Sequence, residues 1–451
     1  MLNPSLNRFV VGTLIYRSNR ASRTSVSHLD RFTDTGEEHM VRNVFDDVLD
    51  RPSLFLDKEV MRHTFRPNNL LHRDAEIEQL RFNLVEALRG HIPSNMLLYG
   101  VTGAGKTAVT MYMIRQLEAK AEVLQKSVNT VMVNCRKIDT QYRVLAHLGN
   151  SLLEEDEVDI PFTGWPTDRV MNEVTRRMDR KGGVHVIILD EIDFLVKKSG
   201  NDLLYFLTNL NSDLKHARSS VIGISNDLTF TEYLDPRVLS RLGQHDITFS
   251  PYDAQQLGDI LTQRAELGIE AELLDDDVIP LCSALAAQEH GDARRALDLL
   301  RVSIEVAEMG SATTVGAHHV RVAQQRIECD HLTPVIETLP FKQKLVLFSI
   351  LLAEKHGLRN IYTGELYNIY SQACAHVNQQ TVTQRRVTDF ISNLDMLGLI
   401  NSKLVNRGRQ GRTKEINSCI PATLDAIEVM QEQEPLMRGL QDRGYTYQSR
   451  L

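Results

Sequence analysis

The residues with the clearest chemical meaning form the segment GVTGAGKT at positions 100–107, which follows an apolar run and opens a helical pattern. Its three glycines allow the backbone to turn so that N–H groups face bound phosphates. Lys106 would contact the β and γ phosphates of ATP, and the Thr107 hydroxyl would be a ligand of Mg²⁺. The sequence therefore predicts an ATP or ADP site that includes Gly100, Val101, Thr102, Gly103, Ala104, Gly105, Lys106 and Thr107.

A second motif, VIILDEID at positions 186–193, ends an apolar run with carboxylates. In a parallel sheet the end of this strand would lie beside the phosphate loop. Asp190 would then bind Mg²⁺ together with Thr107, and Glu191 would orient or activate the attacking water. An apolar strand that simply meets solvent is the alternative. The phosphate loop upstream favours the catalytic interpretation.

Polar residues suited to phosphate chemistry also follow the next strand-like run. Asn226, in GISND, would orient the water or sense the γ phosphate, and a turn-forming asparagine is the alternative. Arg237 and Arg241, in LDPRVLSRLG, are four residues apart on an expected helix and would share one face. We favour Arg241 as an arginine finger that reaches the ATP of a neighbouring copy. Solvated surface arginines are the alternative.

A further motif, GDARRALDLL at positions 291–300, contains two adjacent arginines in a helical pattern. Arg294 would reach back to the γ phosphate and report whether ATP is bound. Adjacent side chains on a helix point in different directions, so Arg294 and Arg295 cannot both do this. A salt-bridged helix residue is the alternative for Arg294.

These motifs need elements to position them, and the pattern of apolar residues supplies candidates. From about 54 to 251, short apolar runs alternate with amphipathic segments, which predicts an α/β domain with a mostly parallel sheet. The expected strands are residues 96–100, 131–135, 184–190 and 220–225. Residues 253 to about 330 have apolar positions three and four apart, which predicts an α-helical lid.

The pattern changes again after Pro340. Three helical stretches at 341–358, 363–377 and 381–400 precede a hairpin-like segment with a basic, Gly-containing centre, which together predict a winged helix. Residues 381–420 contain seven Lys or Arg and three acidic residues, a local charge of +4. Residues 380–386 would enter the major groove of DNA and the hairpin arginines would meet the minor groove. The predicted DNA contacts are Arg385, Arg386, Arg407, Arg409, Arg412 and Lys414.

The composition limits the remaining classes of protein. The chain has 451 residues and a formal charge of −8, so any contact with nucleic acid must be local rather than a bulk positive coat. The five cysteines are scattered and odd in number, which indicates reduced, buried thiols in a cytoplasmic protein. The longest apolar run near the start, residues 9–16, is too short to span a membrane.

The motifs, taken in this order, resemble the AAA+ initiator clade, and most closely the archaeal origin-recognition and replication-licensing initiators. These are relatives of the largest subunit of the eukaryotic origin recognition complex and of the cell division control licensing factor. The resemblance extends from about residue 44 to the winged helix. It implies ATP and Mg²⁺ as cofactors, and double-stranded origin DNA, the replicative helicase and neighbouring initiator copies as partners, with no membrane.

The resemblance also assigns roles to segments that carry no chemistry of their own. FRPNNLLHRDAEI at 65–77 is similar to the family's adenine-proximal segment, so it places Arg73, with Pro67 and His72, near the base or ribose. Tyr252 is also expected to contribute to nucleotide binding. Two segments, RKIDTQYRVLAHL at 136–148 and VDIPFTGWPTD at 158–168, are similar to the initiator-specific insertion, which implies DNA contacts by Phe162, Thr163 and Gly164. A mere interior connection is the alternative, and the acidic run EEDEVD before it must face away from phosphate.

The expected organisation is a flexible extension at 1–43, an AAA+ α/β domain at 44–251, a helical lid at 252–332 and a winged-helix domain at 333–451. The expected function is an ATP-dependent replication initiator that binds origin DNA, helps to recruit or load the helicase, and hydrolyses ATP slowly as a switch. The alternative function is an AAA+ regulator of transcription, plasmid maintenance or transposition that uses the winged helix to bind protein.

Overall fold

The structure is a computed structural model, and it describes residues 53–154, 157–358, 360–406, 412–421 and 424–446. The expected extension at 1–43 lies outside these residues, and so do Arg407 and Arg409 of the expected hairpin tip. The backbone of Arg412 is described, whereas its side chain is not.

A five-stranded parallel sheet forms the centre of the first domain, in the order β2-β3-β4-β1-β5. Its strands are β1 (Met96–Gly100), β2 (Val128–Asn134), β3 (Gly183–Asp190), β4 (Ala217–Ser225) and β5 (His245–Phe249). All five residues of β1 are buried, because this strand lies between two neighbours and is covered on both faces. The sequence predicted the first four strands. It missed β5, an edge strand in which only Ile247 and Phe249 are buried.

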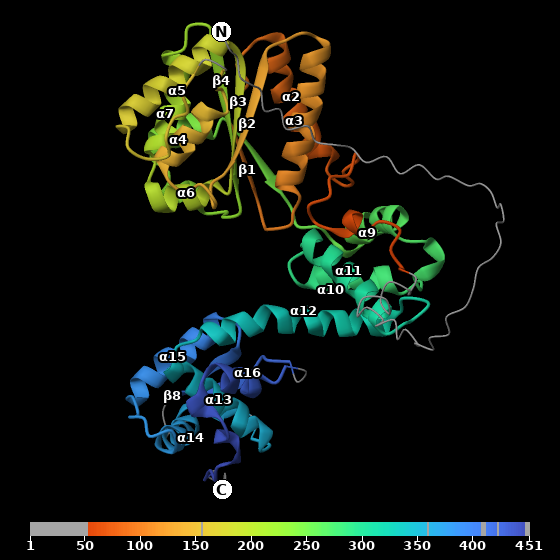
Figure 1. The fold of residues 1–451 in the computed structure, drawn as a ribbon, viewed down its shortest axis with the longest axis vertical. Helices are drawn as coiled ribbons and strands as arrows, with labels where there is room; N and C mark the ends of the chain where they lie inside the picture. Colours follow the sequence, from red (N-terminus) through yellow and green to blue (C-terminus); the bar gives the residue numbers. More distant parts are fainter. Residues whose placement is uncertain (1–52, 155–156, 359, 407–411, 422–423, 447–451) are drawn as a thin grey trace, which may run out of the picture. The chain divides into compact units, whose positions relative to one another are not determined.

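Helices cover both faces of this sheet and bury two separate apolar cores (Figure 1). One face is covered by α2 (Asp74–Arg89) and α3 (Lys106–Val123), whose apolar residues pack against β1, β3 and β4. The helices on the other face are α4 (Gln141–Asn150), α5 (Thr167–Lys181), α6 (Ile192–Ser199), α7 (Asp202–Asn209) and α8 (Pro236–Leu242). The arrangement brings the carboxyl ends of the strands, and with them the motif residues, to one edge of the sheet.

The helical lid is built from α9 (Ala254–Gly268), α10 (Val278–Gln288), α11 (Ala293–Met309) and the first turns of α12 (Ala317–Thr338). Leu54 and Met61, from the segment before α2, are buried in the lid's core. Arg264 of α9 strengthens this attachment, because its buried guanidinium donates to the carbonyls of Val60 (3.1 Å) and Phe65 (3.3 Å). Residues 54–61 therefore pack with the lid, although they precede the α/β domain in sequence.

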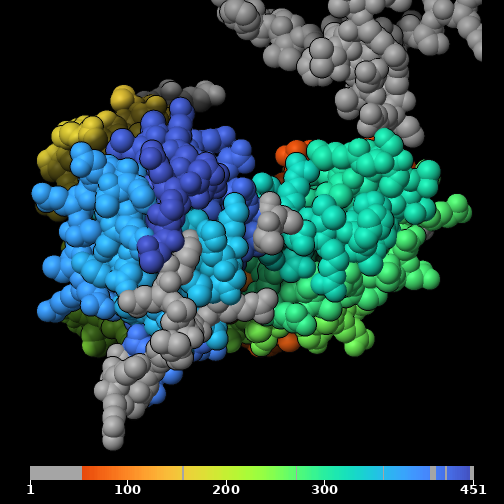
Figure 2. Space-filling view, turned by 90° about the horizontal axis from the view of Figure 1, so that it is seen from below, coloured from red at the N-terminus to blue at the C-terminus, as the bar shows by residue number. Residues whose placement is uncertain are grey.

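The C-terminal domain is a winged helix, as the sequence predicted. Its helices are α13 (Phe341–Lys355), α14 (Thr363–His376), α15 (Gln384–Met396) and α16 (Ala426–Gln433). The wing consists of β7 (Ile400–Asn406) and β8 (Arg412–Ser418), which pair antiparallel, and β6 (Ile361–Tyr362) adds a third strand beside β8. Neither β6 nor α16 was predicted. Part of the surface of this domain appears in shades of blue in Figure 2. Within the described ranges, no helix combines the length and hydropathy needed to cross a membrane.

One buried histidine makes the stability of the α/β domain depend on pH. His185 of β3 is 1% exposed, and its Nε2 lies 3.1 Å from the carbonyl of Met178, so this nitrogen carries the proton that it donates. Burial lowers the pKa of His185 to about 4. The unfolded chain takes up a proton here below roughly pH 6.5, whereas the folded chain stays neutral, so folding loses stability as the pH falls.

We expect His185 to account for a loss of about 1 kcal/mol in unfolding free energy between pH 7.5 and pH 5.5. Urea unfolding of the wild-type chain and of His185→Gln at both pH values measures this contribution. The variant should show the smaller decrease. An equal decrease in both chains would mean that His185 is not the titrating group.

Candidate functional site

The phosphate loop connects β1 to α3, and its three glycines have the positive φ angles that such a loop needs. Gly100, Gly103 and Gly105 have φ of +153°, +71° and +89°, values that residues with a side chain rarely adopt. Space is also restricted at these positions. A Cβ at Gly105 would lie 2.7 Å from the hydroxyl of Tyr252, and one at Gly103 would overlap the carboxylate of Asp292. Glycine is therefore strongly favoured at these positions of the loop.

Lys106 begins α3 and is turned inward, with only 4% of its surface exposed. Its ammonium donates to the carbonyls of Gly100 and Val101, both at 2.8 Å. Burial and the nearby Arg294 lower the pKa of Lys106 to about 8, against the opposite effect of neighbouring aspartates. A triphosphate in the loop would supply the negative charge that this ammonium lacks.

The two residues expected to bind Mg²⁺ lie next to each other. The Thr107 hydroxyl donates to Asp190 at 3.2 Å, and Asp190 is 8% exposed at the end of β3. Burial raises the pKa of Asp190, although the hydrogen bond from Thr107 acts in the other direction. A hydroxyl and a carboxylate are the hard oxygen ligands that Mg²⁺ prefers, so these side chains fit the cation. When bound, Mg²⁺ would neutralise phosphate charge at this position.

Glu191 follows Asp190 and occupies an unusual backbone conformation. Its φ of 55° and ψ of 45° are left-handed, a conformation that costs about 1–3 kcal/mol for a residue with a side chain and often occurs at functional sites. Glu191 and Asn226 both line the same cavity as Lys106. Asp193, by contrast, is buried and accepts a hydrogen bond from Ser225 at 3.2 Å, so it supports the strand ends.

The cavity itself has a volume of about 580 Å³ and is formed by the phosphate loop, the segment at 63–71, the end of β2 and the first turns of α11. Lysines and arginines predominate among its charged residues, which suits a polyanionic ligand. The charged lining residues are Arg66, Lys106, Arg115, Arg136, Lys137, Asp190, Glu191, Arg264 and Arg294.

Sequence reasoning missed five of these basic residues. The resemblance assigns Arg136 and Lys137 to the initiator-specific insertion, yet they lie just beyond the end of β2 and line the cavity. The signal that could have identified them is their position after a strand of the parallel sheet, whose carboxyl end faces the ligand. Arg115 is three turns into α3 and has no motif to identify it.

Arg73 lies beneath the loop, although the sequence placed it at the base or ribose of the nucleotide. Its buried guanidinium donates to the carbonyls of Ala104 (3.0 Å) and Ser250 (2.7 Å), stacks on the ring of Tyr252, and is not part of the cavity lining. Tyr252 and Pro67 do line the cavity. Arg73 therefore stabilises the phosphate loop from outside the cavity, because its hydrogen bonds go to protein groups.

The lid touches the phosphate loop directly. The backbone N–H of Ala293, at the start of α11, donates to the Gly103 carbonyl at 3.4 Å. Arg294 lines the cavity with an exposed side chain, whereas Arg295 pairs with Glu289 at 2.7 Å. The two arginines thus point in different directions.

The two arginines of α8 are both exposed, but they differ in their partners. Arg237 makes two 3.1 Å hydrogen bonds with Asp235. Arg241 has no ion pair within the described part of the chain, and it does not line the cavity of its own chain. Arg241 is therefore the arginine of this pair that is available to another molecule.

The residues that are expected to contact DNA and whose side chains are described lie in the loop between α4 and α5 and in the winged helix, and all of them are exposed except Lys414, which is half-buried. Phe162 is 52% exposed, and Thr163 and Gly164 beside it are exposed too, in the loop between α4 and α5. In the winged helix, Arg385 and Arg386 are exposed in the first turn of α15. Arg386 also lies over the ring of Phe390. Lys414 of β8 donates to the Ser392 hydroxyl of α15 at 2.7 Å, which fastens the wing to the helix.

Three family models match successive parts of the chain. They are an AAA ATPase domain at residues 69–224, a Cdc6 AAA+ ATPase-type lid domain at 258–325, and the CDC6 C-terminal winged helix domain at 334–424. The three matches follow the order of the α/β domain, the lid and the winged helix.

Relatives confirm this assignment over most of the chain. The ORC1-type DNA replication protein 1 of Methanosarcina acetivorans is 52% identical over 380 residues, which cover 84% of this chain and 91% of that protein. The chain belongs to the archaeal ORC1-type/Cdc6 family of replication initiators. Another ORC1-type relative, from Pyrococcus furiosus, is 48% identical over 381 residues, covering 84% of this chain and 91% of that protein.

A solved structure of the same family extends the comparison to three dimensions. The ORC1 protein of Aeropyrum pernix, determined in complex with DNA, is 44% identical with a TM-score of 0.70. The match covers 86% of this chain and 98% of that one. The fold of this ORC1-type/Cdc6 chain, an AAA+ domain followed by a lid and a winged helix, is therefore the fold of its family.

The close contact at Gly103 gives a test of the nucleotide site. We expect Gly103→Ala to weaken binding of a fluorescent ATP analogue about tenfold or more, because the new methyl group strains a left-handed residue and displaces Asp292 of the lid. Fluorescence anisotropy titration measures this affinity.

Gly90→Ala is the matched control, since Gly90 also has a left-handed φ of +82° but has open space around the position of a Cβ. This control should cost about 1 kcal/mol of stability and leave nucleotide affinity unchanged. Unaltered affinity in Gly103→Ala would show that the contact between loop and lid is not needed for binding.

Proposed function

We propose that this chain is an ATP-dependent replication initiator that binds double-stranded origin DNA through two elements. These are its winged helix and the insertion loop, which is the loop between α4 and α5 that contains residues 162–164. The observation that carries the proposal is the combination, in one chain, of a glycine-built phosphate loop in contact with a lid and a winged helix with exposed arginines. The Aeropyrum pernix ORC1 structure with DNA supports it, at 44% identity over most of the chain.

The DNA contacts in the winged helix are assigned to side chains by charge, and Arg385 and Arg386 are also exposed. Arg385 and Arg386 project from the first turn of α15, the helix of a winged helix that reads the major groove. The wing contributes Arg407, Arg409, Arg412 and Lys414, which would neutralise phosphates or enter the minor groove. Phe162, Thr163 and Gly164 would add a second, largely uncharged contact from the α/β domain.

The nucleotide acts as a switch in this proposal. ATP in the cavity would contact both the phosphate loop and Arg294 of the lid, so its γ phosphate would affect how the lid meets the α/β domain. Hydrolysis would begin with water that Glu191 activates and Asn226 orients. It would be slow, because Arg241 does not line the cavity of its own chain and would act only on the ATP of a neighbouring copy.

The same proposal includes recruitment or loading of the replicative helicase onto the origin. The family assignment supports this step through the replication role that the relatives' names state. In the cell, we expect the protein to be cytoplasmic and associated with the nucleoid.

The DNA assignment is tested by removing arginines from the two winged-helix elements. We expect Arg385→Ala/Arg386→Ala to weaken binding to the DNA beside its own gene and to relax sequence preference, since each base-reading arginine contributes about 1–3 kcal/mol. Arg407→Ala/Arg409→Ala/Arg412→Ala should weaken binding to all sequences and reduce the salt dependence by about one ion per phosphate contact. Footprinting and anisotropy at several salt concentrations measure both effects.

Arg81→Ala/Arg89→Ala is the matched control for charge, because these exposed arginines of α2 pair only with Glu78 and Glu86 among the described residues. It should leave DNA affinity unchanged. Unchanged origin binding in the wing variant would instead favour a wing that binds protein.

The switch is tested by separating nucleotide binding from hydrolysis. We expect Glu191→Gln to bind ATP normally and to hydrolyse it about a hundredfold more slowly, because the residue would act only on the attacking water. Arg241→Ala should retain ATP binding and lose only the hydrolysis that depends on protein concentration or DNA, with Arg237→Ala as its control. Radiolabelled phosphate release measures the rate, and wild-type turnover in Glu191→Gln would exclude this role.

A further inference from the structure

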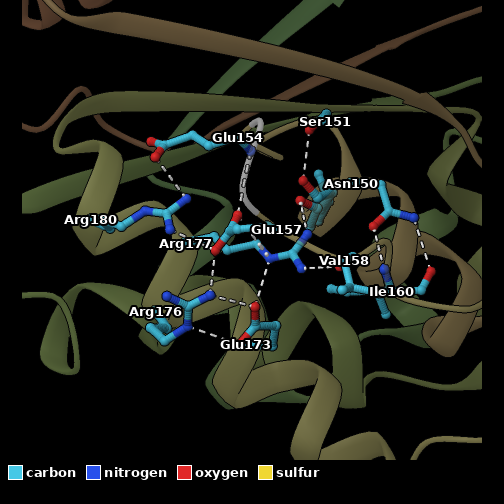
Figure 3. Close-up of polar contacts among 12 residues, drawn as sticks. Asn150, Ser151, Glu154, Glu157, Val158, Ile160, Glu173, Arg176, Arg177 and Arg180 are labelled. Atoms are coloured by element: carbon cyan, nitrogen blue, oxygen red, sulfur yellow. Dashed lines mark hydrogen bonds and ion pairs between the residues drawn. The ribbon is translucent and has the colours of Figure 1, made fainter. Parts of the chain in front are cut away.

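Two carboxylates of the acidic run between α4 and α5, Glu154 and Glu157, pair with arginines of α5. Glu154, Glu157 and Glu173 are joined to Arg176, Arg177 and Arg180 in one network of ion pairs (Figure 3). Glu154 and Glu157 precede the exposed loop tip at 162–164 in the sequence, whereas Glu173 and the three arginines follow it. The network neutralises two carboxylates that are close in sequence to a surface expected to meet DNA.

Arg177 is the centre of the network and one of the largest fully buried side chains of the protein, at 1% exposed. Its guanidinium donates to the Gly149 carbonyl in α4 (3.1 Å), to the Val158 carbonyl in the loop (2.7 Å) and to the Glu173 carboxylate (2.8 Å). A single side chain therefore joins the end of one helix, the connecting loop and the next helix (Figure 3).

Glu157 turns its own carboxylate inward. Its side chain is 7% exposed and contacts Arg176, Arg180 at 2.7 Å and Arg177 at 3.5 Å. Burial raises its pKa, but the arginines outweigh this effect and hold the pKa below its ordinary range. Hydrogen bonds from Arg176 and Arg177 lower the pKa of Glu173 to about 2, against the effect of burial. These carboxylates therefore stay ionised and are neutralised by protein groups.

A second set of contacts fixes the chain just before the loop tip. Asn150 makes two hydrogen bonds with the backbone of Ile160, at 2.8 and 2.9 Å (Figure 3). The Ile160 side chain is buried against Gly149, where a Cβ would overlap it. Ile160 is thus held in place by both its backbone and its side chain.

The tip is also fixed on its other side. The Tyr142 hydroxyl donates to the Pro161 carbonyl at 3.0 Å and accepts from the Trp165 N–H at 3.1 Å. Between these two bonds, Phe162, Thr163 and Gly164 are exposed, and nothing lies within 4 Å of the place where a Gly164 Cβ would be. The exposed tip is therefore short and tethered at both ends.

We infer that Arg177 is a positioning residue for DNA binding, which holds the loop so that Phe162, Thr163 and Gly164 are presented in a fixed conformation. The inference rests on the proposed function, in which this tip contacts DNA. Two physical effects support it. A tip ordered before binding avoids the entropy cost of ordering on DNA, and pairing with arginines reduces the repulsion that Glu154 and Glu157 would exert on phosphates.

The test uses variants of Arg177 and of its partner Glu157, which are called the anchor variants. Both leave the tip residues 162–164 unchanged. Arg177→Lys keeps the positive charge but cannot reach all three acceptors, and Glu157→Gln removes one charge with almost no change in shape. We expect each to weaken DNA binding about three- to tenfold and to leave affinity for an ATP analogue unchanged. Glu305→Gln is the control, because Glu305 is also held by two cations, Lys58 and Arg301, but belongs to the lid.

Two measurements test whether Arg177 positions the tip, because a change in stability alone would not produce the expected results. Trp165 is the only tryptophan in the chain, so its fluorescence reports on the loop, and we expect its anisotropy to fall in both anchor variants. A double-mutant cycle with Phe162→Ala then asks whether the anchor acts through the tip. If it does, Arg177→Lys/Phe162→Ala binds DNA no more weakly than the weaker of the two single variants.

Each result of these experiments either supports or contradicts the positioning role of Arg177. If Phe162→Ala weakens binding but the anchor variants do not, or if their effects multiply, Arg177 does not position the tip, and the proposed DNA function still stands. If Phe162→Ala changes nothing, the tip makes no DNA contact and the inference falls, while the Arg385 and Arg386 variants test DNA binding separately. If Arg177→Lys does not fold, Glu157→Gln carries the same test alone.

Discussion

The contact between the phosphate loop and the lid at Gly103 is the constraint on which the nucleotide site depends. The Gly103 carbonyl accepts from Ala293, and the absence of a side chain at Gly103 leaves room for Asp292. Asp292 in turn caps α11 by accepting from the N–H of Arg294 at 2.7 Å. Because the same short segment contacts the loop and carries Arg294, the proposed switch would need no further element between the γ phosphate and the lid.

The protein has a net charge of −8, yet its proposed ligands are both polyanions. The structure resolves this conflict locally. Basic residues line the cavity, with Lys106 buried among loop carbonyls, while Arg385 and Arg386 extend into solvent from α15. In the acidic run, Glu157 is turned toward Arg177 and its neighbours rather than toward the loop tip. Local basic surfaces can therefore coexist with a negative total charge, because salt largely screens exposed charges that lie farther apart than about 10 Å.

Helices and strands with a clear pattern of apolar residues could be predicted from the sequence. Elements that form only through contacts with distant parts of the chain could not. The apolar runs of β1 and β3 are buried on both faces, so their composition alone identifies them. β5 has only two buried residues, and β6 is two residues long, so neither leaves a pattern. Leu54 and Met61 pack in the lid's core although they precede the α/β domain, because burial depends on the fold rather than on sequence order.

The sequence by itself determined the phosphate loop, the carboxylates after β3 and the order of the three domains, because these depend on residues close together in the chain. Only the tertiary structure decided that Arg73 stabilises the phosphate loop from outside the cavity and that Arg115, Arg136 and Lys137 line the cavity. It also decided that Arg177 joins α4, the insertion loop and α5. The physical reason is that a hydrogen bond is set by distance and direction in space, and an arginine side chain is long enough to reach partners that no spacing in the sequence reveals.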